Sequence, residues 1–156
     1  EQFGRHCEVG TLGQHKLPFT VLPKSRTLRA GDELPAGPDV LLREYQQIIF
    51  PKACLDVFAN PRLGELVESL QVGEYVVFGV CTEYCIATAV EGLLARGAKV
   101  AIVTDAIRPL DEAKGAQALK RFADRGVRFV HTAEVVHSAE EEPVSTGTGD
   151  DVDDAL

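Results

Sequence analysis

Two cysteines four residues apart are the residues of this sequence best placed to do chemistry. Cys81 and Cys85 lie between an apolar run and a periodic apolar stretch. If that stretch is a helix, Cys85 falls in its first turn, where free backbone N–H groups and the helix dipole stabilise a thiolate. The same N–H groups can hold the oxyanion formed when a thiolate attacks a carbonyl. Two plainer interpretations also fit the spacing: an inert cysteine packed under the helix, and a redox pair of thiols.

A strand and a helix must position this turn. Residues 75–78 have the length and β-branched character of a buried strand, and Gly79 is expected to break it. Thr82 is the expected N-cap of the helix and Gly97 its stop. The helix is predicted from apolar residues at the i, i+3, i+4, i+7, i+8 spacing of one helical face, namely Ile86, Ala89, Val90, Leu93 and Leu94.

The rest of the second half alternates in the same way. Strands are predicted over residues 99–103 and 126–130, with a helix over residues 111–125 between them. Strands that alternate with helices predict a parallel sheet with helices on its faces, hence an α/β fold of three layers, α/β/α. Ligands bind beyond the carboxyl ends of such strands. We therefore expect Pro51-Lys52, residues 80–85 and Thr104-Asp105 to meet at one edge.

The first half is less regular. Residues 1–13 have a loop-like composition, residues 18–22 suggest a short extended piece, and Gly and Pro turns predict a surface loop over residues 26–39. A short strand is predicted over residues 47–50. Asn60 followed by Pro61 is a typical helix start, and the helix should run to about Leu70.

Length and charge limit the function classes. The 156 residues predict one domain over residues 1–137 and an acidic, disordered tail over residues 138–156. Seven acidic residues of the tail account for most of the net charge of −8, so we expect no nucleic-acid partner. The sequence contains no apolar run long enough for a membrane span, no signal peptide and no metal-finger cysteine pattern, so we expect a cytoplasmic protein. No GxGxxG or Walker motif is present, and we expect no organic cofactor.

Three segments, taken in order, resemble one known family. Residues 79–86 read GVCTEYCI and are followed by Gly97 and by residues 103–106, VTDA. Residues 3–13 are similar to a Trp-Pro-x-His-Cys-x-x-Gly-Thr-x-Gly segment, and Pro51-Lys52 with Phe58 is similar to a lysine-bearing segment. Together they resemble the nicotinamidase and isochorismatase-like cysteine hydrolases, from Phe3 to about Val136.

The resemblance implies roles for particular residues. Cys85 would be the nucleophile, Lys52 would stabilise its thiolate, and the N–H groups of Cys81 and Cys85 would form the oxyanion hole. The peptide bond between residues 80 and 81 would be cis. Phe3 and Tyr84 would contact the substrate. Some members bind a divalent metal, zinc or iron, through the histidine that corresponds to His6.

The sequence also departs from the family pattern. The family's triad aspartate and its Asp-x-His metal motif lie on strands that precede the segment beginning at Phe3, so the resemblance implies a domain that lacks its first strands. Cys81 replaces a more usual alanine. If Asp56, Glu83 or Asp105 lay beside Lys52 and Cys85, that carboxylate would take the place of the family's triad aspartate.

The hypothesis that follows is a cysteine amidohydrolase acting through a thioester. Nicotinamide is the first substrate candidate, and an N-carbamoyl or ureido amide is the second. A catalytically incomplete, non-enzymatic scaffold is the alternative from another class. Apart from a small-molecule amide, the partner expected by analogy with the family is a second copy of the chain, in a homo-oligomer.

Overall fold

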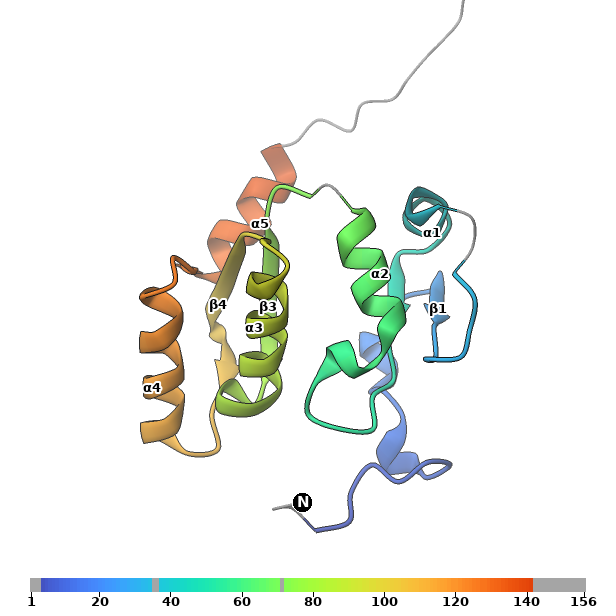
Figure 1. The fold of residues 1–156 in the computed structure, drawn as a ribbon, viewed down its shortest axis with the longest axis horizontal. Coiled ribbons are helices and arrows are strands. Elements are labelled where there is room, and N and C mark those ends of the chain that lie inside the picture. Colours follow the sequence, from blue (N-terminus) through green and yellow to red (C-terminus); the bar gives the residue numbers. More distant parts are fainter. Residues whose placement is uncertain (1–3, 35–36, 71, 142–156) are drawn as a thin grey trace, which may run out of the picture.

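The fold consists of two small parallel sheets flanked by helices (Figure 1). It was obtained as a computed structural model, which describes residues 4–34, 37–70 and 72–141. The first sheet pairs β1 (Ser25–Thr27) with β2 (Gln47–Ile49). The second has the order β3-β4-β5, from β3 (Tyr75–Val80), β4 (Val100–Arg108) and β5 (Arg128–Val130). All the pairings are parallel, as the alternation of strands and helices predicts.

Alternate residues of β4 point to opposite faces of the second sheet, and helices cover both. Val100 and Ile102 pack with α3 (Ala87–Ala95) and α4 (Glu112–Ala123) in the largest core cluster. Ala101 and Val103 pack on the other side, where Val135 of α5 (Thr132–Glu141) contacts them. The predicted three-layer α/β/α arrangement is therefore confirmed.

Helix α2 (Pro61–Ser69) joins the two halves, because it buries residues on both of its sides. Val67 belongs to the core cluster under α3, whereas Leu66 packs with Leu28 and Leu41. Leu41 lies on α1 (Pro38–Glu44). Asn60 is the N-cap of α2, as predicted: its side-chain oxygen accepts from the Arg62 N–H at 3.1 Å. Figure 1 shows α2 between the β1–α1 side and the β3–α3 side.

Four short helical segments complete the elements of the described residues. Three are 3₁₀ turns, η1 (Leu12–Gln14), η2 (Pro18–Thr20) and η3 (Val57–Ala59). The fourth, η4 (Thr82–Ile86), is a π-helical turn that leads directly into α3. None of the helices in the described residues is long and apolar enough to cross a membrane.

Several predictions about the first half were wrong. Residues 26–39 are not a surface loop: they include the end of β1 and the start of α1, and Leu28 is fully buried. The strand was missed because its three residues are too few to show the alternation of apolar and polar side chains that predicts a strand, and Gly and Pro turns follow it. Residues 18–22 contain the 3₁₀ turn η2 rather than an extended piece.

Two further boundaries differ from the prediction. Gly79 does not end β3, which continues to Val80; the glycine has a φ of +124° and marks a shift in the register with β4. Helix α5 includes residues 138–141, which the sequence assigned to the tail. The remainder of the predicted tail lies outside the described residues.

Candidate active site

The side chains of Lys52 and Cys85 meet at the carboxyl ends of β2 and β3. The Lys52 Nζ lies 3.1 Å from the Cys85 Sγ and donates to the Leu55 carbonyl at 2.7 Å. These residues are 33 positions apart in the chain, and each follows the strand of a different sheet. An ammonium at this distance stabilises a thiolate through a charge-assisted hydrogen bond.

The turn that carries Cys85 begins at Cys81, the N-cap of η4. The Val80–Cys81 peptide bond is cis. The Cys81 carbonyl accepts from the N–H groups of Tyr84 and Ile86. The N–H group of Cys81, which the sequence predicts to bind an oxyanion, belongs to this cis peptide bond.

The expected N-cap, Thr82, does not cap the helix. Its side chain is only 1% exposed, and its hydroxyl has no hydrogen-bond partner in the part of the chain that the structure describes. The π-helical turn begins at Thr82 itself, so Cys81 takes the cap position and the Thr82 side chain is buried.

None of the three candidate carboxylates contacts the pair. Asp56 accepts from the Phe58 N–H at 2.9 Å, and Glu83 accepts from the N–H groups of Leu110 and Asp111 at 3.0 and 2.8 Å. Asp105 accepts from the Thr132 N–H at 2.9 Å, and this bond holds the pKa of its carboxyl below the usual range.

The predicted meeting of three segments is therefore correct for only two of them. Residues 51–52 and 80–85 come together, but Thr104-Asp105 lies inside the longer strand β4. The Thr104 hydroxyl donates to the Val130 carbonyl at 3.1 Å, so both residues hold β5 and α5 instead.

The residues expected to bind a metal or a substrate ring are only partly described. The Nδ1 of His6 is 2.7 Å from the Gly4 carbonyl, on the exposed segment before η1. No group of three or more His, Cys, Asp or Glu side chains in residues 4–34, 37–70 and 72–141 is arranged to hold a metal ion, so these residues do not fit a metal site. Phe3 lies outside the described residues.

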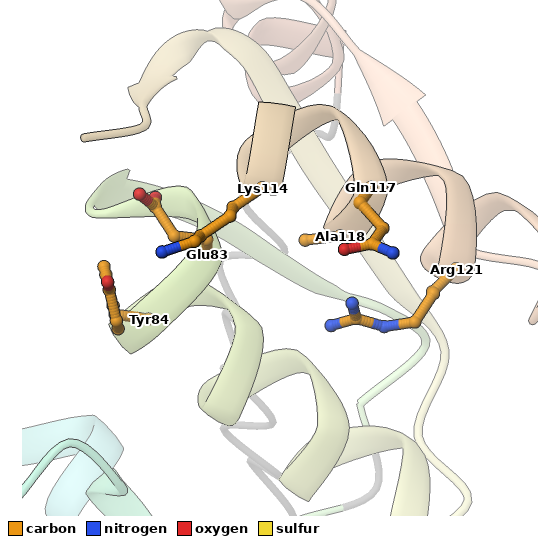
Figure 2. A pocket seen from close by; sticks show the side chains of 6 residues that line it. All are labelled: Glu83, Tyr84, Lys114, Gln117, Ala118 and Arg121. Atoms are coloured by element: carbon orange, nitrogen blue, oxygen red, sulfur yellow. The ribbon is translucent and has the colours of Figure 1, made fainter. Parts of the chain in front are cut away.

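Tyr84 borders a pocket on the α4 side of the turn. This pocket, of about 260 Å³, is lined by Glu83 and Tyr84 of η4 and by four residues of α4, Lys114, Gln117, Ala118 and Arg121 (Figure 2). Neither Cys85 nor Lys52 lines it. It is smaller than most ligand pockets. The contact between the Lys52 amine and the Cys85 thiol therefore lies outside this pocket.

Sequence reasoning missed the groups that hold Lys52 in place. The Leu55 carbonyl also accepts from the Thr88 hydroxyl at 3.0 Å. Asn60, 2% exposed, donates to the carbonyls of Leu28 and Pro51 at 3.0 and 3.4 Å in addition to capping α2. Carbonyl acceptors carry no signal in a sequence. Thr88 could have been noticed only by its position three residues after Cys85.

Comparisons with known proteins agree with this architecture. The model of the isochorismatase domain matches residues 10–134. Similar solved structures include an isochorismatase family protein from Desulfovibrio vulgaris (17% identity, TM-score 0.62). The match with it covers 88% of this chain and 61% of the Desulfovibrio chain. They also include a nicotinamidase/pyrazinamidase from Bacillus subtilis (16% identity, TM-score 0.60; 83% and 63% covered). A third is the pyrazinamidase of Pyrococcus horikoshii in complex with zinc (23% identity, TM-score 0.58; 81% and 62% covered).

At these identities the structural likeness shows the fold. The chain spans 61–63% of the lengths of these three structures. No curated protein sequence matches it. The family match extends over most of the chain, including Lys52, Cys81 and Cys85. This chain therefore belongs to the isochorismatase domain family.

Proposed function

We propose that Cys85 is the nucleophile of a cysteine amidohydrolase, with Lys52 as the cation that stabilises its thiolate. The 3.1 Å contact between the Lys52 Nζ and the Cys85 Sγ carries this proposal. The amine and the thiol follow strands of two different sheets, and the cis peptide bond at the start of the turn of the thiol carries the Cys81 N–H. A thiol, a cation beside it and an N–H group for the oxyanion are three of the groups that acyl transfer uses.

The reaction proceeds in two halves. The Cys85 thiol loses its proton to a base, and the thiolate attacks the amide carbonyl carbon, whose oxygen becomes an oxyanion held by the N–H groups of Cys81 and Cys85. The C–N bond then breaks, and the nitrogen leaves as ammonia after taking up a proton. Water attacks the resulting thioester, which releases a carboxylic acid and restores the thiol. Nicotinamide, which would give nicotinate, is the first substrate that we propose, and an N-carbamoyl or ureido amide is the second.

The base and the metal of the family pattern have no counterparts among the contacts of this pair. No carboxylate in the described residues hydrogen-bonds to Cys85 or Lys52. This observation favours the second candidate function, a scaffold that is catalytically incomplete. No step is assigned to a metal, because the described residues do not fit one.

The activity of variants at Cys85 and Lys52 distinguishes the amidohydrolase from the catalytically incomplete scaffold. Cys85→Ala should lower ammonia release from nicotinamide at least about a thousandfold, and Lys52→Met by about a hundredfold or more, because each removes a group that acts at the transition state. Cys54→Ala is the matched control, since this exposed cysteine lies two residues from Lys52 but bonds only to the Asp56 carbonyl. Ammonia release should be measured with the unaltered protein first.

Two results would contradict the proposal. Turnover that survives Cys85→Ala would exclude this cysteine as the nucleophile. An unaltered protein that releases no ammonia from nicotinamide or from carbamoyl amides would support the scaffold.

A further inference from the structure

One face of α3 and of the turn before it contacts the segment that carries Lys52, residues 52–58, at three points. The residues of this face are spaced i, i+3, i+7 and i+11, as neighbours on one side of a helix are: Cys85, Thr88, Gly92 and Arg96. Cys85 meets Lys52, and Thr88 donates to the Leu55 carbonyl. Further along, the Phe58 ring lies against Gly92 and under the Arg96 guanidinium, 4.1 Å from it.

The Leu55 carbonyl is the point where this face and Lys52 meet. Its oxygen accepts from the Lys52 Nζ at 2.7 Å and from the Thr88 Oγ1 at 3.0 Å. A carbonyl oxygen has two lone pairs, so these two donors fill it and fix its direction. The Lys52 ammonium has three protons on a flexible stem, and its second contact is the Cys85 sulfur at 3.1 Å.

Few other contacts hold this carbonyl. Residues 51–56 are all exposed, and buried contacts begin only with the Phe58 ring and with Asn60. The Thr88 hydroxyl has a single proton, and its other acceptor is the Cys85 carbonyl of its own helix, at 3.1 Å. When that proton points to Leu55, the hydroxyl ties the helix of the thiol to the loop of the amine.

We propose that Thr88 is a positioning residue, which sets the Lys52 ammonium against the Cys85 sulfur through the Leu55 carbonyl. Without the Thr88 hydroxyl, the Leu55 carbonyl is free to turn. The Lys52 ammonium would move with this carbonyl, because its bond to the carbonyl, at 2.7 Å, is shorter than its contact with the Cys85 sulfur, at 3.1 Å. This inference rests on the roles of Lys52 and Cys85 in the proposed function. It adds a residue that touches neither the substrate nor the thiol.

The test is the alkylation rate of Cys85 by iodoacetamide at neutral pH, resolved by peptide mass spectrometry in the chain with all four cysteines retained. Thr88→Val keeps the shape and removes the hydroxyl, and it should slow Cys85 alkylation about two- to tenfold, the effect of one hydrogen bond. Thr88→Ser should restore the rate. Thr104→Val is the matched control, since it removes a hydroxyl that donates to the Val130 carbonyl, and it should leave the Cys85 rate unchanged.

A double-mutant cycle of Thr88→Val with Lys52→Met shows whether Thr88 acts by positioning Lys52 or only supports the fold. In the Lys52→Met chain Cys85 should react more slowly, and Thr88→Val should then have no further effect. The proposal is overturned if Thr88→Val leaves the rate unchanged, if it causes the same loss with and without Lys52, or if Lys52→Met alone has no effect. Alkylation requires no turnover, so this result stands apart from the ammonia assay that tests the proposed function.

Discussion

At the scale of single residues, the two cysteines of the turn have different surroundings. Cys85 lies against an ammonium, whereas Cys81 lies near the carboxylate of Glu83. Burial raises the pKa of the Cys81 thiol, and the neighbouring charges of Glu83 and Cys85 raise it further. Because only the thiolate is nucleophilic, the raised pKa makes Cys81 a weak nucleophile at neutral pH.

This difference predicts a pH dependence for Cys81. A raised pKa leaves the thiol protonated at neutral pH, so alkylation of Cys81 should accelerate only as the pH becomes alkaline. Glu83→Gln keeps an oxygen for the N–H groups of Leu110 and Asp111 but removes the charge. The Cys81 profile should therefore move to lower pH in this variant. A profile that moves upward, measured by peptide-resolved alkylation, would contradict the assignment.

At the scale of elements, the contact between α3 and the Lys52 segment depends on the lack of a side chain. A Cβ built on Gly92 would lie 2.2 Å from a carbon of the Phe58 ring. The Phe58 ring also stacks on Arg96, so it has little room to move away. Glycine costs a helix about 1 kcal/mol relative to alanine, and here the close approach accounts for its presence.

Gly92→Ala should accordingly destabilise the protein although it improves helix propensity. Overpacking costs about 1–3 kcal/mol, which exceeds the gain of about 1 kcal/mol from propensity. Because Phe58 belongs to the segment of Lys52, the Cys85 alkylation rate should fall as well. Chemical denaturation measures the first effect and peptide-resolved alkylation the second.

Gly64→Ala in α2 is the matched control. Its Cβ would lie 3.1 Å from the Arg96 Nη2, a much milder approach than the 2.2 Å at Gly92. Stability should stay equal or rise slightly. Equal losses in the two variants would show that Phe58 does not limit the space at Gly92.

At the scale of the whole molecule, one face of the second sheet is only partly covered. Helix α5 packs on Ala101 and Val103 of that face, but the β3 side chains there stay exposed: Val76 at 41%, Phe78 at 68% and Val80 at 64%. These three residues alternate with inward-facing ones along a strand at the edge of its sheet. Exposed apolar side chains that adjoin one another in this way form a surface to which hydrophobic molecules bind.

The exposed strand face should bind a hydrophobic dye such as ANS in the native state. Replacing Phe78 and Val80 together by threonine should lower the dye fluorescence and change the free energy of unfolding by only about 0.5 kcal/mol, as surface substitutions do. Leu110→Thr is the control, because Leu110 is equally exposed, at 65%, but lies outside this face. Unchanged fluorescence in the double variant would show that the dye binds elsewhere.

The sequence predicted those parts whose residues follow a period or a cap. The strand at residue 75, the helix that Gly97 ends and the Asn60-Pro61 start were all predicted, because each shows a local pattern of apolar, capping or turn residues. The buried Leu28 and the inward turn of Thr82 were missed. The first depends on packing against Leu41 and Leu66, and the second on a π-helical turn, neither of which has a sequence signal.

The split of the amine and the thiol between two sheets also matters for the newly made chain. Lys52 is synthesised 33 residues before Cys85, and among the described residues no strand of one sheet pairs with a strand of the other. A nascent or partly unfolded chain therefore presents an ordinary surface amine and an ordinary thiol. Lys52 and Cys85 come into contact only once both halves have docked, so the pair forms late in folding and depends on the complete fold.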